Sequence, residues 1–256
     1  MRRLITVFAI VGVSALLDGC LYYRLTQTYR QLCDNSPRIA ILELDAGGRV
    51  LVFDEPTLFD TDVACLMGAA PSASEATRHG KQWRYVATPM DIEASADRAI
   101  IVDLTFVSAD GGYRLSRATL PPQLERILSP HLIDQSISAA CHGELDLIRR
   151  TARVDLSGID RASLPDRASV IELFGPPNDP TSADGTLSWS YCLGSCTAPD
   201  HPTIMSKVDV TFDPSGQIEQ VTADYLQYSA HANFTEERAR VTFRGSIARI
   251  SLDCGL

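Results

Sequence analysis

The first residues follow a different pattern from the rest of the chain. Leu4 to Leu17 is an apolar stretch without charge, and Arg2 and Arg3 precede it. A helix that spans a bilayer needs about 20 apolar residues, whereas a shorter apolar stretch after a cationic start is typical of a secretory signal peptide. We therefore expect residues 1–19 to be removed on export and to contribute nothing to the fold.

Beyond this segment, two stretches repeat the same order of apolar and polar positions. In each, a helical pattern ends at a glycine, a strand with alternating aromatic residues follows, and a second alternating strand comes next. The chain has only two tryptophans, and they occupy equivalent positions in the two copies. Self-similarity of this kind indicates an internal duplication. The equivalent residues are Gly68 and Gly175, Trp83 and Trp189, Tyr85 and Tyr191, and Asp103 and Asp209.

Each copy is expected to form the same unit. A helix should begin near 57–61 in the first copy and near 163–165 in the second, with Pro165 in its first turn. Gly68 and Gly175 stand where C-capping glycines belong, and turn residues follow the second strand of each copy. The predicted fold class is α+β, with two tandem repeats of short helices packed on an antiparallel β-meander.

The remaining segments are predicted as strands and helices. Residues 39–44 and 49–53 flank a turn sequence and should form a hairpin. Residues 121–141 have helical spacing, which we expect Pro130 to kink. The resulting organisation is a signal peptide at 1–19, an N-terminal helix at 20–33, repeat 1 at 34–120, a linker helix at 121–142, repeat 2 at 143–228 and C-terminal strands at 229–256.

The signal peptide ends in Leu17-Asp18-Gly19-Cys20. This resembles the lipobox of bacterial lipoproteins, although Asp18 replaces the usual small residue. The resemblance implies cleavage before Cys20 and acylation of its thiol, and each buried CH₂ of an acyl chain contributes about 0.8 kcal/mol to membrane attachment. The residue after Cys20 is Leu21 and not Asp, and this resembles the sorting signal of lipoproteins that are sent to the outer membrane. The alternative is an ordinary secretory signal with an incidental cysteine.

The net charge and the cysteines indicate which partners and sites are to be expected. A net charge of −9 argues against a nucleic-acid partner. Of the seven cysteines, six remain besides Cys20, and an even number in an exported protein predicts disulfides whose pairing the sequence leaves open. A zinc site at Cys192, Cys196 and His201 would lack an evident fourth ligand, so no cofactor is expected. The disulfide candidates are Cys33, Cys65, Cys141, Cys192, Cys196 and Cys254.

The second copy carries a family resemblance. Phe-Gly-Pro-Pro at 174–177, Trp-x-Tyr at 189–191 and Val-x-Phe-Asp-x-x-Gly-x-Ile at 210–218 are similar to the SmpA/OmlA domain of BamE-like outer-membrane lipoproteins. Two such units in tandem also resemble the architecture of beta-lactamase inhibitory protein. The resemblance implies helices packed on one face of an antiparallel sheet and a non-catalytic binding or scaffolding role.

No motif of a hydrolase, metalloprotease, phosphate-binding loop or dinucleotide-binding fold is found in the sequence. Asp103 and Asp209 alternate with apolar residues, so we expect them on the solvent face of a sheet. Trp83 and Trp189 either line a binding surface or fill the space between helix and sheet.

The sequence therefore predicts a non-catalytic envelope lipoprotein, anchored to the outer membrane and facing the periplasm. We expect it to bind or scaffold another envelope protein, in outer-membrane assembly or integrity, without a small-molecule substrate. The alternative is a periplasmic thiol- or metal-dependent enzyme or a small-ligand carrier.

Overall fold

The computed structural model describes residues 21, 23–34, 39–43, 49–90, 98–119, 121, 129–146, 149, 151–178, 185–193, 204–226 and 228–243. The predicted signal peptide and Cys20 lie outside these residues. The described chain contains the helices α2 (Asp60–Met67), α4 (Pro130–Cys141) and α5 (Arg167–Phe174), a short 3₁₀ helix (Arg161–Ser163) and helical residues within 21–33.

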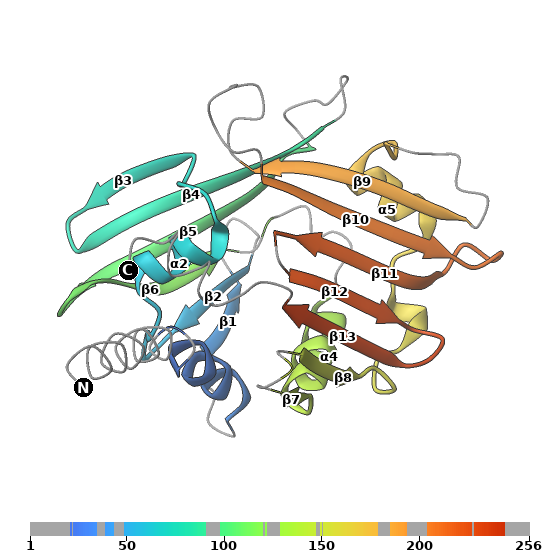
Figure 1. Cartoon of the computed structure of the whole chain (residues 1–256), viewed down its shortest axis with the longest axis horizontal. Helices are drawn as coiled ribbons and strands as arrows, with labels where there is room; N and C mark the ends of the chain where they lie inside the picture. Colours follow the sequence, from blue (N-terminus) through green and yellow to red (C-terminus); the bar gives the residue numbers. More distant parts are fainter. Residues whose placement is uncertain are drawn as a thin grey trace, which may run out of the picture.

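The strands of the described chain form one antiparallel sheet (Figure 1). Of its 13 strands, all but β3 follow the order β1-β2-β6-β5-β4-β9-β10-β11-β12-β13-β8-β7, and β3 pairs with β4 beside this path. The strands are β1 (Ile39–Glu43), β2 (Arg49–Phe53), β3 (Ala73–Thr77), β4 (Gly80–Pro89), β5 (Ile100–Ala109), β6 (Gly112–Thr119), β7 (Glu144–Asp146), β8 (Thr151–Asp155), β9 (Thr186–Leu193), β10 (Ile204–Phe212), β11 (Ile218–Tyr225), β12 (Tyr228–Asn233) and β13 (Arg238–Phe243).

The prediction of two tandem helix-on-meander repeats is wrong. The two repeated stretches are joined edge to edge, because β4 pairs with β9 through Ala87–Leu193, Thr88–Cys192 and Pro89–Tyr191. A further backbone bond runs from Met90 N–H to the Ser190 carbonyl at 2.9 Å. The described part of the chain is therefore mostly β, with few helices on one continuous sheet rather than two separate α+β units.

Hydrophobic side chains gather where the helices meet the sheet. Val63 of α2 packs with Tyr85 and Phe106 of β4 and β5, and Val170 of α5 packs with Trp189 and other residues of β9–β11. Because in-register residues of paired strands point to the same face, the β4–β9 pairing places α2 and α5 on the same face of the sheet. A third cluster lies under α4 and consists of Leu132, Leu156 and Ile159.

Helix boundaries agree with the sequence at some points and differ at others. Gly68 adopts the left-handed conformation (φ 62°) that a C-cap requires, as predicted. Pro165 does not lie in the first turn of α5, because Asp166 is the N-cap and accepts a bond from Ser169 N–H at 2.8 Å. Pro130 does not kink a helix within the described residues. It is the first residue of α4, a position that tolerates its missing N–H, and Ser129 caps the helix.

A disulfide and several polar contacts hold helical residues 23–33 against the body of the protein. Cys33 is bonded to Cys141 at the end of α4. Tyr29 donates its hydroxyl to the Ala140 carbonyl at 2.8 Å, and the Arg24 guanidinium binds both oxygens of Asp62 at 2.5 and 2.7 Å. Helical residues 23–33 are thus attached to α4 through the disulfide and to α2 through the ion pair.

Candidate binding surface

The β3–β4 hairpin forms a partly exposed surface beside the main path of the sheet. We call it the hairpin surface, and it consists of β3, the turn at Arg78 and His79, Lys81, Trp83 and Tyr113. All five residues of β3 are exposed, and no described strand pairs with its outer edge (Figure 1). An edge strand with unpaired backbone groups is a ready template for a strand from another chain. This makes β3 a candidate contact point for a protein partner.

The hairpin keeps its position through a close backbone approach at Gly80. A Cβ placed on Gly80 would lie 1.8 Å from the carbonyl oxygen of Phe106 in β5. The Ser108 N–H donates to the His79 carbonyl at 3.0 Å, which ties the turn to the same strand. Only glycine allows the hairpin to lie so close to β5.

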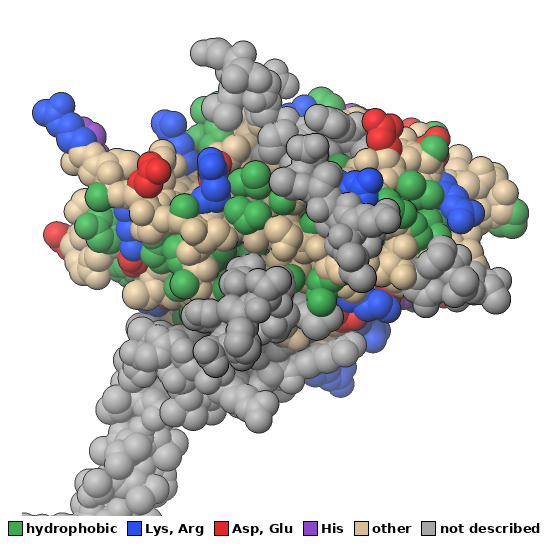
Figure 2. Space-filling model, turned by 90° about the horizontal axis from the view of Figure 1, so that it is seen from above, with side chains coloured by type: hydrophobic (Ala, Val, Ile, Leu, Met, Phe, Trp, Pro, Cys, Tyr) green, Lys and Arg blue, Asp and Glu red, His purple; other side chains and the backbone are tan. Residues whose placement is uncertain are grey.

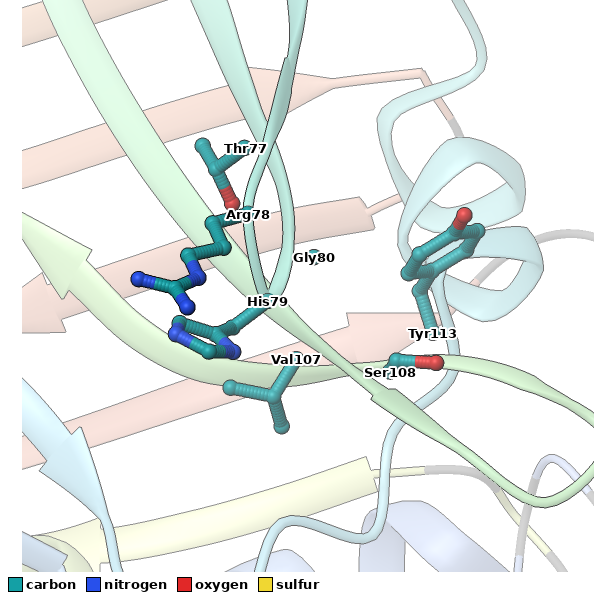
Figure 3. Close-up of a pocket in the computed structure, with 7 residues that line it drawn as sticks. All are labelled: Thr77, Arg78, His79, Gly80, Val107, Ser108 and Tyr113. Atoms are coloured by element: carbon teal, nitrogen blue, oxygen red, sulfur yellow. The ribbon is translucent and has the colours of Figure 1, made fainter.

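A shallow cavity of about 520 Å³ lies at the tip of the hairpin (Figure 3). Figure 3 shows Arg78 and His79 on one side of the hairpin and Tyr113 on the other. Both turn residues are exposed, and neither has an ion-pair partner among the described residues. Figure 2, viewed from above, shows basic and histidine side chains projecting together from one end of the molecule. The lining residues are Thr77, Arg78, His79, Gly80, Val107, Ser108 and Tyr113.

Lys81 organises the aromatic side chains beside this cavity. Its ammonium pairs with Asp60 of α2 and lies 4.1 Å from the centre of the Trp83 ring and 4.8 Å from that of Tyr113. A cation over an aromatic face is attracted by the ring. Lys81 therefore holds Trp83 and Tyr113 in place at the border between the core and the solvent.

The two tryptophans differ in their surroundings although their sequence positions correspond. Trp189 is only 2 % exposed, packs on Phe174 and donates its Nε1–H to the Gly175 carbonyl at 3.0 Å. Trp83 is half-buried and packs on Phe106, and its Nε1–H has no acceptor among the described residues. Trp189 therefore fills the space between helix and sheet, whereas Trp83 stays available at the hairpin surface.

We expect Trp189→Phe to lower the free energy of unfolding by about 2 kcal/mol, because it removes a buried hydrogen bond and part of a buried ring. Trp83→Phe should lower it by less than about 1 kcal/mol, since that indole makes no such bond. Urea unfolding of the two variants checks this. Equal losses would contradict the difference between the two sites.

The repeated carboxylates bind neighbouring side chains on the strands. Asp103 receives two hydrogen bonds from the exposed Arg84 at 2.7 and 2.9 Å, and this pairing raises the pKa of the arginine. Asp209 pairs with Lys207 at 2.8 Å and accepts a bond from Ser188. Both carboxylates thus form pairs at the surface of the sheet.

The repeated tyrosines are both buried. Burial raises the pKa of Tyr85 and of Tyr191 above the ordinary value, and burial raises the pKa of Tyr225 to about 12. Tyr85 donates to the Ala69 carbonyl at 3.3 Å, while the Tyr191 hydroxyl has no hydrogen-bond partner among the described residues. Gly175 caps α5 with φ 79° and leaves room for the side chain of Arg98. These residues therefore belong to the core.

The described cysteines are joined in disulfides. Cys33 and Cys141 are bonded to each other. Cys65 and Cys192 each take part in a disulfide as well. Cys192 is 1 % exposed, so it is not a solvent-reactive thiol. Cys20, Cys196, Cys254 and His201 lie outside the described residues, and within the described part of the chain no three metal-binding side chains come together.

Comparisons with known proteins found no related protein. No family model matches the chain, and no curated protein or solved structure shows significant similarity to it. Among the described helices, none has the length and hydrophobicity needed to cross a membrane.

Sequence reasoning did not find β3, Arg78, His79 or Lys81. The segment Ala-Ser-Glu-Ala-Thr has no apolar alternation and contains residues that are depleted in strands. The signal that was present is Gly80, since an isolated glycine in a strand pattern marks a close backbone approach.

Proposed function

We propose that this protein is a non-catalytic lipoprotein of the bacterial envelope, anchored to the outer membrane through Cys20, that binds another envelope protein. The lipobox and the signal-peptide pattern support the anchor and the export. The hairpin surface supports the binding role, since it combines a strand edge that no described strand pairs with and a half-buried tryptophan.

The observation that best supports the proposed export is the disulfide between Cys33 and Cys141, together with the disulfide-bonded state of Cys65 and of Cys192. Disulfides persist in oxidising compartments such as the periplasm and are rare in the cytosol. The Cys33–Cys141 bond also fixes the helical segment that begins just after Cys20. A lipid on Cys20 would then hold the body close to the membrane rather than on a long tether.

Replacing Cys20 with serine tests the anchor, because serine offers no thiol for acylation. The wild-type protein should fractionate with the membranes and enter the detergent phase on extraction. The Cys20→Ser variant should lose the detergent-phase partitioning, because the acyl chains supply the attachment. Ser157→Ala, in an exposed turn away from the disulfides, is the control and should partition like the wild type. Equal detergent partitioning of the Cys20→Ser variant and the wild type would reject lipidation at this residue.

A further inference from the structure

The backbone groups on the outer edge of β3 can be assigned from the hairpin register. Thr77 and Gly80 close the two-residue turn at Arg78 and His79, so they form a hydrogen-bonded pair. Hydrogen-bonded and non-hydrogen-bonded pairs alternate along an antiparallel ladder. Ser74 and Ala76 are therefore in non-hydrogen-bonded pairs with β4, and their N–H and C=O groups point away from the sheet.

Ser74 and Ala76 have small side chains, so they leave space beside β4 for the side chains of an added strand. Ser74 is in register with Trp83, and Ala76 is in register with Lys81. The two small side chains lie next to an aromatic ring and a long cationic side chain on the same face of the sheet. A strand added to β3 would place side chains beside Ser74 and Ala76, on the face that carries Trp83, where apolar side chains fit best.

Charges on β3 define which strand fits. Glu75 is the one charged residue of β3, and its carboxylate acts on the neighbouring Arg84 of β4. At the end of the strand, Arg78 and His79 project without a described ion-pair partner. Antiparallel pairing of β3 with β3 of a second copy, centred on Glu75, would place two glutamates opposite each other, and like charges directly opposite are destabilising. The charge of Glu75 therefore disfavours pairing of β3 with β3 of a second copy of this protein.

We propose that β3 binds an extended segment of another protein by antiparallel strand addition. The segment carries a cationic side chain opposite Glu75, a carboxylate at Arg78 and His79, and apolar side chains over Ser74 and Ala76. Backbone hydrogen bonds give such a contact its affinity, and the side chains give it specificity. This inference rests on the proposed binding function and names the kind of partner that the hairpin surface accepts.

The probe is the acetylated and amidated peptide Asp-Thr-Val-Lys-Val-Thr, whose Asp reaches Arg78 when its Lys lies opposite Glu75. Its matched control is the charge-swapped peptide Lys-Thr-Val-Asp-Val-Thr. Titration of the purified mature protein, followed by backbone amide NMR, should show shifts confined to β3, the turn and Trp83. The probe should bind at least about tenfold more tightly than the swapped peptide, since complementary charges discriminate between partners.

Two variants test the mode of binding. Ala76→Pro removes an outward N–H and leaves the β3–β4 bonds intact, so binding of the probe should fall at least about tenfold, whereas Ala76→Ser should bind like the wild type. Arg78→Glu should reverse the preference for the two peptides, and Arg153→Glu, on the distant β8, should not. Arg78 is exposed, so its variant tests the charges even if Ala76→Pro fails to fold.

Absence of β3 shifts at about 1 mM probe, equal binding of the two peptides, or shifts that survive Ala76→Pro would each overturn strand addition. Concentration-dependent dimerisation lost in Ala76→Pro would overturn it in favour of a second copy. Because the protein in this experiment is purified and free in solution, the result does not depend on lipidation. A failure of the peptide to bind therefore does not bear on lipidation of Cys20. A failure of the Cys20→Ser test does not bear on strand addition.

Discussion

Arg24→Met is expected to lower the free energy of unfolding by about 3 kcal/mol, because it leaves the carboxylate of Asp62 buried without its counter-ion. Asp62 is fully buried, and the guanidinium side chain is 22 % exposed. Breaking a buried ion pair by removing one partner costs about 3–5 kcal/mol, and the partial exposure of Arg24 places the expected loss at the lower end. The same carboxylate accepts the Phe59 N–H at 2.8 Å at the start of α2, so it cannot move into solvent without uncapping that helix.

Arg84→Met is the matched control for this prediction. Arg84 binds Asp103 in the same two-bond geometry, but both side chains are exposed, at 55 % and 41 %. Exposed ion pairs contribute about 0–1 kcal/mol, so this variant should unfold close to the wild-type midpoint. Urea unfolding followed by circular dichroism compares the two variants. Equal losses would show that burial of Asp62 does not govern the contact.

Removing the Cys33–Cys141 disulfide should lower the free energy of unfolding by about 4–5 kcal/mol. The bond joins residues 108 positions apart, and a crosslink that closes a loop of about 100 residues restricts the unfolded chain by roughly that amount. Its two ends precede β1 and β7, which are the two terminal strands of the sheet path. The double variant Cys33→Ser/Cys141→Ser should therefore lose stability without losing the strand order.

The control for the disulfide is the wild type under reducing conditions. Once all disulfides are reduced, the wild type and the double variant should unfold at nearly the same urea concentration. Under oxidising conditions their midpoints should differ clearly. A double variant as stable as the oxidised wild type would contradict the role of this bond as the link between the N-terminal helix and α4.

Local features of the fold were predictable because they depend on neighbours in the sequence. The alternation around Trp83 and Trp189 located β4 and β9, and the turn sequence after residue 44 located the β1–β2 hairpin, with β1 paired to β2 from Ile39–Phe53 to Glu43–Arg49. Gly68 ended α2 where only a residue tolerant of positive φ fits. In each case a few adjacent residues decide the conformation.

The pairing of distant strands was not predictable from these patterns. Alternation indicates which side chains face the core. The backbone pairing of β4 with β9, which includes the bond from Met90 N–H to the Ser190 carbonyl, has no sequence signature. For the same reason a duplicated pattern was interpreted as two separate units instead of two parts of one sheet. The prediction failed at the edge between the copies, where the sequence carries no information about which strand lies alongside.

The candidate site was predictable only in part. Trp83 was singled out from the repeat, but its exposure differs from that of Trp189 because Phe174 and the Gly175 carbonyl cover the second indole.

The Arg24–Asp62 pair, outside the candidate site, joins residues 38 positions apart, and Asp62 by itself is an ordinary acidic residue in the first turn of a helix. Contacts of this kind become visible only when the chain is folded.

Intact mass spectrometry of the protein extracted from membranes tests whether the chain is exported, lipid-anchored and disulfide-bonded. We expect a chain cut before Cys20, with the mass of acyl chains added, that gains hydrogens when it is reduced. An unacylated product that retains residues 1–19, or one whose mass is unchanged by reductant, would contradict an exported, lipid-anchored and disulfide-bonded protein.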